Sequence, residues 1–370
     1  MVIYTVSERG GAHASLCTLV RCLDPAIELS VVSTRPDIAA ELAGLRVGTD
    51  KCVVVPVRNK ADLPGILRHA RAVRALRPDV LHVSSDNPWS APYGLLAGLI
   101  SRSPTVAVLH GPAPAWRRRQ RWLVRRVIGH LDALVSVSDA SARAVELSLG
   151  LARGRVRTIY NAVDLGARDG AEEGASTATD PSRPLVGAVG RLSPEKGFDV
   201  LVRAVAQLPG ARTVVAGDGP ERETLERLAH ELGIASLVTF VGWVDPPWSD
   251  HLVPDVLVVP SRREGFGLVA AEALMSGIPV VASAVGGLPE VLEEGVAGLL
   301  VPPEDPTALA RAIESVLSDG QSTRARVSRG LESARRRFEP TAMAATYAAL
   351  YAELAGWSGT ASARSLEPSG

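Results

Sequence analysis

Residues 256–289 constrain the fold of this chain more than any other stretch. They read VLVVPSRREGFGLVAAEALMSGIPVVASAVGGLP, which predicts a strand, a loop, a helix, a second strand and a glycine-rich loop. The apolar, β-branched runs at 256–259 and 278–282 are typical of strands buried on both faces. Between them, residues 266–275 carry apolar side chains at helical spacing, and Gly-Ile-Pro ends that helix. This succession indicates an open α/β sheet.

The polar groups of this stretch fall where such sheets bind ligands, outside the carboxyl ends of the strands. Glu264 lies in the loop before the predicted helix, and Glu272 lies about two turns into it. The N–H groups of residues 267–269 are free donors at the helix start, which favours an anion there. The arrangement suits a sugar attached to a diphosphate. Spacing alone would equally fit two solvated glutamates, so the signal is the whole succession of EGFG, AAEALMSGIPVVA and GGLPE.

The same alternation of short apolar runs and helical patterns extends over most of the chain. Strands are predicted at residues 2–6, 28–33, 52–57, 78–83, 105–109, 134–137, 156–160, 185–189, 213–216 and 237–241. Helices are predicted at residues 13–22, 63–76, 93–100, 116–128, 306–317, 327–337 and 338–357. Residues 166–184, rich in Gly, Ala, Ser and acids, predict a flexible linker between two domains, and residues 358–370 predict a disordered tail.

Composition places the chain among globular proteins, because 46% of its 370 residues are apolar and 22% are charged. Three cysteines without a CxxC spacing predict free thiols in a reducing compartment. The chain enters a strand almost at once, and its longest apolar stretch, residues 91–100, is too short to span a bilayer. We therefore expect a cytoplasmic protein, with peripheral contact at the inner membrane face left open.

Charge is divided unevenly between the halves of the chain. Residues 1–165 hold 22 Lys and Arg against 13 Asp and Glu, giving +9, and residues 166–370 hold 18 against 27, giving −9. A basic first half is compatible with an anionic acceptor or a membrane surface, and equally with simple attraction between the two halves.

Four motifs, GRLSPEKG at 190–197, GDGP at 217–220, EGFG at 264–267 and GGLPE at 286–290, occur together and in this order. With them, the chain closely resembles the retaining glycosyltransferases of family 4. The resemblance covers nearly the whole chain and is most specific over residues 184–306.

This resemblance implies an α/β protein of GT-B fold, with two Rossmann-like domains facing each other across a cleft. The terminal helix of such proteins crosses back onto the first domain. The expected acceptor-side domain therefore comprises residues 1–165 plus 338–357, and the nucleotide-sugar-binding domain comprises residues 185–337.

Four residues are the expected catalytic set. Arg191 and Lys196 flank a proline turn after a predicted strand, and charge-assisted bonds from two cations suit a diphosphate. The resemblance identifies their loop as the phosphate-binding loop. It also implies that Glu264 holds the hydroxyls of the donor sugar and supports the positively charged ring. His110 follows a predicted strand, and the resemblance places it near the donor sugar, although a satisfied loop histidine would look the same.

The resemblance implies a wider set of donor-binding residues. The Gly10–Gly11 turn would face the diphosphate, although the pair alone would also fit an ordinary strand–helix turn. Glu272 would bind the ribose hydroxyls. The backbone of the EGFG loop and of the following helix start, together with a strand end beside the base, completes the set: Gly265, Phe266, Gly267, Leu268, Val269 and Val244.

The expected reaction is the transfer of a sugar, with retention, from a nucleotide diphosphate to an acceptor hydroxyl. A UDP-sugar is the commonest donor in this family and is a substrate, so no cofactor is expected. The acceptor is expected to be a small polar molecule or natural product, and a lipid-linked acceptor at the membrane surface is the alternative. The sequence contains no Asp-x-Asp, which predicts metal independence, and it shows no nucleic-acid-binding motif.

Two other functions remain open at this point. A GT-B epimerase would share the fold, but EGFG together with GRLSPEKG argues against it. A non-catalytic sugar-nucleotide-binding subunit of a larger assembly is less favoured, because the four expected catalytic residues are intact.

Two further segments carry expectations. Residues 116–128, WRRRQRWLVRRVI, form a basic helix that would suit an anionic membrane. A solvated helix packing Trp122, Leu123 and Val127 inward is the preferred interpretation. Ser138 is expected to cap the helix that follows it. The turn at 161–164 resembles the family's Asn-Gly-Val-Asp, but Ala162 replaces its glycine.

Overall fold

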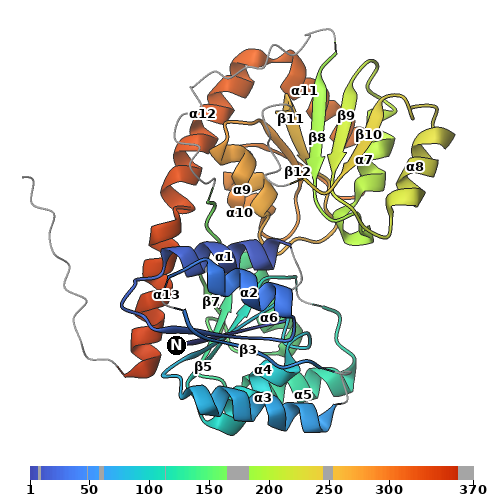
Figure 1. Ribbon diagram of the computed structural model, residues 1–370. Helices are drawn as coiled ribbons and strands as arrows, with labels where there is room; N and C mark the ends of the chain where they lie inside the picture. Colours follow the sequence, from blue (N-terminus) through green and yellow to red (C-terminus); the bar gives the residue numbers. More distant parts are fainter. Residues whose placement is uncertain are drawn as a thin grey trace, which may run out of the picture.

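The computed structural model describes residues 1–6, 10–47, 49–57, 62–112, 114–164, 183–244 and 253–356. These residues form two parallel sheets, each flanked by helices, one above the other in Figure 1. The predicted tail lies outside the described residues, as does the predicted linker up to residue 182.

The first sheet of the described chain has seven parallel strands in the order β3-β2-β1-β4-β5-β6-β7. Its strands are β1 (Val2–Thr5), β2 (Leu29–Ser33), β3 (Thr49–Val54), β4 (Leu81–Ser85), β5 (Thr105–Leu109), β6 (Ala133–Ser136) and β7 (Arg157–Thr158). The accompanying helices are α1 (Gly11–Cys22), α2 (Pro36–Gly44), α3 (Leu63–Leu76), α4 (Pro92–Ser101), α5 (Arg118–Ile128) and α6 (Asp139–Leu149). The chain winds outward from β1 to β3 and then returns to place β4 beside β1, so the strand order reverses at that pair.

The second sheet has six described strands in the order β10-β9-β8-β11-β12-β13. They are β8 (Leu185–Val189), β9 (Arg212–Ala216), β10 (Val238–Gly242), β11 (Val256–Val259), β12 (Val280–Ser283) and β13 (Leu299–Val301). Its helical segments are η1 (Pro194–Lys196), α7 (Phe198–Val205), α8 (Arg222–Glu231), α9 (Leu268–Met275), α10 (Leu288–Val291), η2 (Glu293–Gly295), α11 (Pro306–Ser318) and α12 (Gly320–Arg337). Here the order reverses between β8 and β11, which are paired directly. In such sheets ligands bind at the carboxyl ends of the strands where the order reverses.

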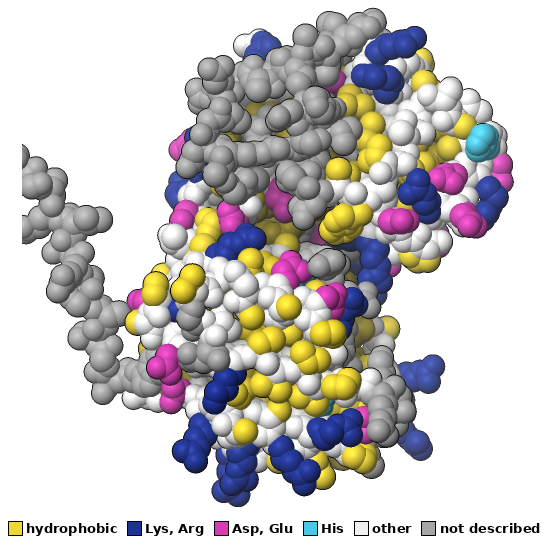
Figure 2. Space-filling view, in the orientation of Figure 1, with side chains coloured by type: hydrophobic (Ala, Val, Ile, Leu, Met, Phe, Trp, Pro, Cys, Tyr) yellow, Lys and Arg dark blue, Asp and Glu magenta, His cyan; other side chains and the backbone are white. Residues whose placement is uncertain are grey.

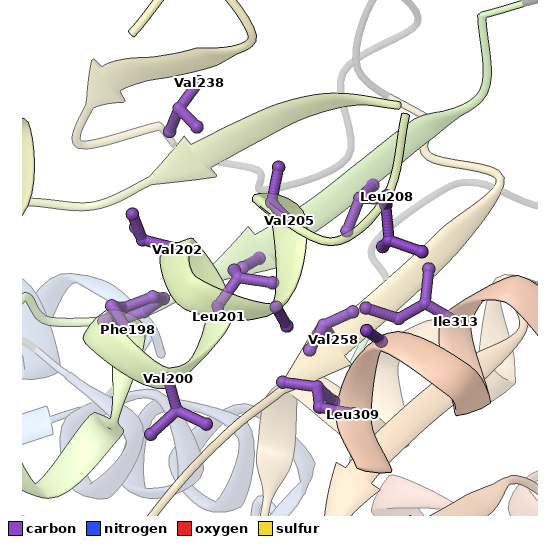
Figure 3. Packing of buried hydrophobic residues seen from close by; sticks show 14 of the residues in the cluster. Phe198, Val200, Leu201, Val202, Val205, Leu208, Val238, Val258, Leu309 and Ile313 are labelled. Atoms are coloured by element: carbon purple, nitrogen blue, oxygen red, sulfur yellow. The ribbon is translucent and has the colours of Figure 1, made fainter. Parts of the chain in front are cut away.

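The second sheet has its main core beneath α7 and α11. Figure 3 shows Val258 of β11 between Leu201 of α7 and the pair Leu309 and Ile313 of α11, and Val205 of α7 belongs to the same buried cluster. Leu201 and Ile313 are fully buried, and each buried side chain of this size contributes about 1.5–3 kcal/mol relative to an exposed one. This core holds β8 and β11 side by side and thereby fixes the loops that follow them.

The last two described helices carry the chain from the second sheet back to the first (Figure 1). Ala334 of α12 belongs to the apolar cluster around α9. Tyr347 of α13 (Pro340–Ala355) packs in the core of the first sheet with Ile3 and Leu16. The hydroxyl of Tyr351 on α13 lies 2.7 Å from Nδ1 of His82 on β4. Helix α13 is thus packed on the first sheet.

Helix α5 buries a different set of side chains from the one predicted. The inward packing predicted for Trp122 and Leu123 is wrong, because these side chains are 62% and 45% exposed. The buried stripe consists of Val124 and Ile128, one turn apart, with Val127 half-buried beside them. Trp122 and Leu123 therefore point to solvent, among the arginines. No helix in the described part of the chain is both long and apolar enough to cross a membrane.

Candidate functional site

The candidate site lies at the reversal point of the second sheet, where two loops meet. The loop after β8 carries Arg191 and η1, and the loop after β11 carries Glu264. Gly197 shows how closely they pack: its φ is 66°, and a Cβ added there would lie 2.1 Å from the carbonyl oxygen of Pro260. The backbone N–H of Arg262 also donates to the carbonyl of Glu195 over 2.8 Å. Close packing of these loops brings residues together that are far apart in sequence.

Lys196 and Glu264 form an ion pair across the two loops. Nζ of Lys196 lies 2.7 Å from Oε2 of Glu264, and the two side chains are 29% and 13% exposed. The hydroxyl of Ser261 donates to the same carboxylate oxygen over 3.3 Å. The pair is therefore partly shielded from water, which strengthens its electrostatic interaction relative to a surface pair. A cation and a carboxylate are thus held together at the reversal point of the second sheet.

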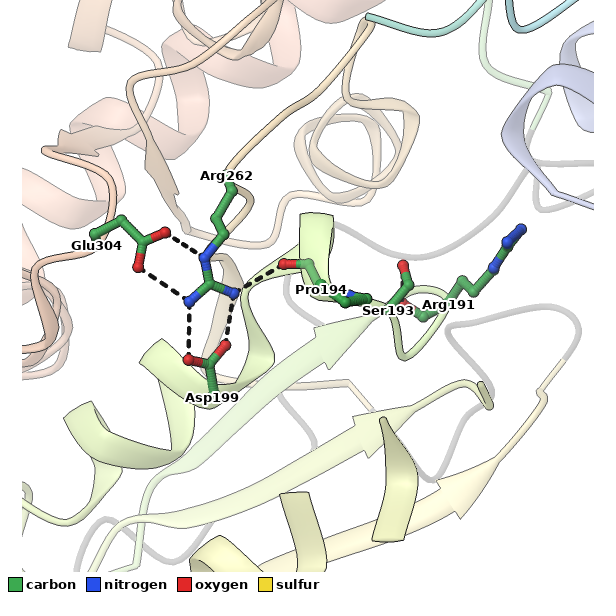
Figure 4. A network of polar contacts seen from close by, with 6 residues as sticks. All are labelled: Arg191, Ser193, Pro194, Asp199, Arg262 and Glu304. Carbon is green, nitrogen blue, oxygen red and sulfur yellow. Dashed lines mark hydrogen bonds and ion pairs between the residues drawn. The ribbon is translucent and has the colours of Figure 1, made fainter. Parts of the chain in front are cut away.

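A second ion cluster, centred on Arg262, holds the loop after β8 in place (Figure 4). The guanidinium of Arg262 binds both carboxylate oxygens of Asp199, over 2.7 and 2.8 Å, contacts Glu304 and donates to the carbonyl of Pro194 over 2.8 Å. The hydrogen bonds from Arg262 lower the pKa of the Asp199 carboxyl. Arg191 extends away from this cluster in Figure 4, and none of the ion pairs in the described chain includes it. Its exposed guanidinium is available for an anion.

The start of α9 provides backbone donors beside Glu264. Gly267 is the N-cap, with φ at 104°, and no side chain among the described residues caps the helix. The first turn closes when the N–H of Ala271 donates to Gly267, so the N–H groups of Leu268 and Val269 precede the helical hydrogen bonds. The helix dipole favours an anion at this position. Phe266 is only 2% exposed, and its ring packs against that of Phe338, so this residue anchors the loop in the apolar core.

Two predicted residues of the first domain, Gly11 and His110, lie against this part of the second domain. A Cβ added at Gly11 would lie 3.4 Å from Cδ1 of Leu268, so the first residue of α1 lies against the start of α9. A Cβ added at Gly265 would lie 2.0 Å from the carbonyl oxygen of His110. The structure therefore brings Gly11 to the start of α9 and His110 to the EGFG loop, across the boundary between the two sheets.

His110 is held as a neutral imidazole. Its Nε2 lies 3.2 Å from the hydroxyl of Ser84, while its Nδ1 is buried and has no partner within the described residues. Burial lowers the pKa of His110 to about 4, because a charged imidazole would lose its hydration. At neutral pH the ring can therefore both donate and accept one hydrogen bond.

Two further predicted residues, Glu272 and Val244, lie on other elements of the second domain. Glu272 is half-buried on α9, in the turn after the N-terminal amides. Val244 follows β10, the edge strand, which β9 separates from β8. Sequence reasoning favoured a helix-capping role for Ser138 over contact with the ligand, and it assigned no role to Ser141 or to Glu290, the last residue of GGLPE. The structure brings these three into contact between the two domains.

One group of possible metal ligands occurs among the described residues. Donor atoms of His13, Cys17 and Glu41 lie within 4.8 Å of one another. Nε2 of His13 lies 3.0 Å from Glu41 and 3.4 Å from the sulfur of Cys17. A histidine–glutamate pair accounts for this geometry without a metal. All three cysteines of the chain are free.

Solved structures share this two-sheet architecture. The chain aligns with Anabaena HepE, solved in complex with UDP and glucose, at a TM-score of 0.81 and 23% identity over 95% of this chain and 100% of that one. It aligns with sucrose-phosphate synthase from Thermosynechococcus elongatus at 0.77 and 25%, over 96% and 99% of the two chains. The protein therefore has the GT-B fold of two Rossmann-like domains, which confirms the predicted fold class.

The sequence itself matches two family models, Glycosyltransferase Family 4 over residues 9–167 and Glycosyl transferases group 1 over residues 171–332. The D-inositol 3-phosphate glycosyltransferase of Mycolicibacterium gilvum is 34% identical over 79% of this chain and 71% of its own length. That of Mycolicibacterium smegmatis is 37% identical over 62% and 55%. The chain belongs to the family 4 glycosyltransferases, as the motifs predicted, and its matched segment spans between about half and about seven tenths of these relatives.

Proposed function

We propose that this protein transfers a sugar from a nucleotide diphosphate, a UDP-sugar, to a hydroxyl of a small polar acceptor, with retention and without a metal. One observation carries the proposal: Lys196 and Glu264 are paired at 2.7 Å next to the N-terminal amides of α9, at the reversal point of the second sheet. This site combines cationic groups, backbone donors and a carboxylate. Those are the groups needed by a diphosphate joined to a sugar.

Breaking the bond between sugar and phosphate leaves negative charge on the diphosphate and positive charge on the sugar ring. Arg191, Lys196 and the amides of Leu268 and Val269 stabilise the leaving diphosphate, and preorganised groups of this kind often contribute most to catalysis. Glu264 lies beside the ring and offsets its positive charge. The acceptor attacks from the face that the diphosphate leaves, and a donor phosphate oxygen takes its proton.

The donor and acceptor classes rest on the relatives. HepE was solved with UDP and glucose, which supports a UDP-sugar here. The mycobacterial relatives are named for D-inositol 3-phosphate, a small polar acceptor, which favours that class over a lipid. The test is a screen of nucleotide sugars for thermal protection and slow hydrolysis, repeated with inositol phosphates and other polyols. A protein that neither binds nor turns over any nucleotide sugar would contradict the proposal.

Replacing Glu272 with alanine is expected to raise the KM for the donor about tenfold or more while kcat changes little. A carboxylate that binds the ribose contacts the substrate and the transition state equally, and hydrogen bonds to a charged group contribute about 1.5–3 kcal/mol. Steady-state kinetics over a donor concentration series measures both constants. Glu314→Ala, on the exposed side of α11, is the matched control. A fall in kcat at unchanged KM would assign Glu272 another role.

The exposed side of α5 favours a second candidate, an acceptor presented at an anionic membrane. Figure 2 shows Lys and Arg side chains at the end of the lower domain, where α3 and α5 lie. Residues 114–131 contain no acid. Six arginines in this segment form no ion pair among the described residues, whereas Arg143 on α6 does. The six are Arg117, Arg118, Arg119, Arg121, Arg125 and Arg126. Exposed Trp122 and Leu123 lie in the same helix.

If this side of α5 binds a membrane, Arg118→Gln with Arg125→Gln is expected to weaken binding to anionic vesicles about thirtyfold, since each arginine contributes about 1 kcal/mol at such a surface. Co-sedimentation with phosphatidylcholine vesicles, with and without phosphatidylglycerol, measures the effect. Arg324→Gln with Arg335→Gln removes the same charge from exposed positions of α12 and is the control. Equal binding by both double variants, or no preference for the anionic vesicles, would exclude this candidate.

A further inference from the structure

The carbonyl of Gly265, next to Glu264, is bound from the first domain. The hydroxyl of Ser138 donates to this oxygen over 2.6 Å, and the hydroxyl of Ser141 donates to it over 2.9 Å. The two serines are 0% and 2% exposed. A buried carbonyl that accepts two hydroxyl donors uses both of its lone pairs. The peptide bond between Gly265 and Phe266, one residue beyond Glu264, therefore has its orientation set by residues of the other domain.

The carboxylate of Glu290, in the second domain, accepts hydrogen bonds from backbone N–H groups at the start of α6. Oε2 of Glu290 accepts from the N–H of Asp139 over 2.9 Å, and Oε1 accepts from the N–H of Ala140 over 2.7 Å. The N–H of Ser141 donates to the Ser138 hydroxyl over 3.1 Å, so the three amides before the first helical bond are all satisfied. The helix dipole favours the negative charge of Glu290 at this end. Two of the three amides depend on the second domain.

Apolar packing surrounds these polar contacts. Val137 and Val163 of the first domain are buried in the same cluster as Phe266 and Phe338. The ring of Tyr160 lies 6.0 Å from that of Phe266, centroid to centroid. Phe266 directly follows Gly265, so the EGFG loop contacts the first domain through both its backbone and a buried side chain. The contact excludes water from the hydrogen bonds to Gly265.

We propose that Ser138, Ser141 and Glu290 form an interdomain clamp that positions Glu264 for reaction. The loop is fixed on one side by Lys196, within the second domain, and on the other by the two serines, from the first. Since this role is defined for the transferred sugar, it rests on the proposed function. The three are positioning residues, because they act through the carbonyl of Gly265 and the start of α6.

The clamp predicts that Ser141→Ala and Glu290→Gln each lower kcat about tenfold, as expected for a lost hydrogen bond that orients a reacting group. The KM for the donor and the melting temperature are expected to change little. Amide hydrogen exchange is expected to increase both at residues 139–142 and at residues 264–267. Ser138→Thr keeps the hydroxyl and is expected to retain wild-type kcat. Asp305→Ala removes the side-chain cap of α11, which lies within the second domain. It is the control for the loss of a helix cap that makes no contact between the domains.

In the clamp variants themselves, either of two results would overturn the clamp: unchanged exchange at 264–267 in both variants, or unchanged kcat despite increased exchange. The exchange measurement needs no substrate. If the wild-type protein turns over no nucleotide sugar, the proposed function fails, while the exchange data still decide whether the contacts couple the two loops. Loss of kcat in Asp305→Ala to the same extent would show that general destabilisation, and not the clamp, lowers activity.

Discussion

Replacing Lys196 with alanine is expected to lower kcat for sugar transfer about a hundredfold, the usual cost of removing one group that stabilises developing charge. The change has two effects in this structure. The leaving diphosphate loses a cation, and Glu264, whose side chain is only 13% exposed, loses the ammonium that lies 2.7 Å from its carboxylate. Single-turnover kinetics with a saturating donor measures the chemical step separately from binding.

Lys51 provides the control for this substitution, because Lys51→Ala removes the same charge from an exposed position on β3. Arg191→Ala is expected to reduce the rate in the same direction, and the double variant to reduce it further. Turnover that survives the neutralisation of both cations would exclude the proposed site. Nucleotide-sugar binding that persists without any turnover in the wild-type protein would instead support a non-catalytic binding subunit.

Gly265→Ala is expected to reduce transfer by more than a hundredfold while the second domain still binds nucleotide. The added Cβ would lie 2.0 Å from the carbonyl oxygen of His110 and 3.0 Å from its carbonyl carbon. Both atoms are backbone, so no side-chain rotation relieves the contact and the two domains must separate locally. The proposed ligands of the diphosphate, Arg191 and Lys196, both belong to the second domain.

This prediction is checked by comparing transfer rates with thermal protection by UDP. Protection is expected to remain, whereas turnover is lost. Gly44→Ala is the control, since a Cβ at Gly44 has no atom within 4 Å. If Gly265→Ala transfers sugar at the wild-type rate, the close approach of His110 to the EGFG loop is not part of the active arrangement.

Most of the fold was accessible from periodicity, because buried parallel strands are continuous apolar runs. The bounds predicted for β5 and β8 match the structure, and those of α3 also match. Helix α2 was not predicted, although Pro36 at its start and Ile38, Ala39 and Leu42 on its buried side are a recognisable signal. The register of α5 was wrong because arginines occupy so much of the helix that its short apolar stripe is ambiguous.

The site could be predicted from the sequence only in part. The motifs identified Lys196 and Glu264 separately, but they are 68 residues apart, and their pairing depends on β8 lying next to β11. The contacts of Ser138 and Glu290 are less accessible still, because they span 127 and 151 residues and join two domains. A pattern within one segment specifies that segment, and the packing of two domains has no such local signature.

The return of α13 to the first sheet has a consequence for how the chain folds during synthesis. Tyr351 fills the core beside His82, and Arg157 near the end of that domain pairs with Glu353 over 2.7 Å. The half that leaves the ribosome first therefore lacks part of its interior until residues 340–355 have emerged. The later half can reach its final form earlier, since domains fold as units once their segments are present. We expect truncation before residue 340 to unfold the domain at the opposite end of the sequence.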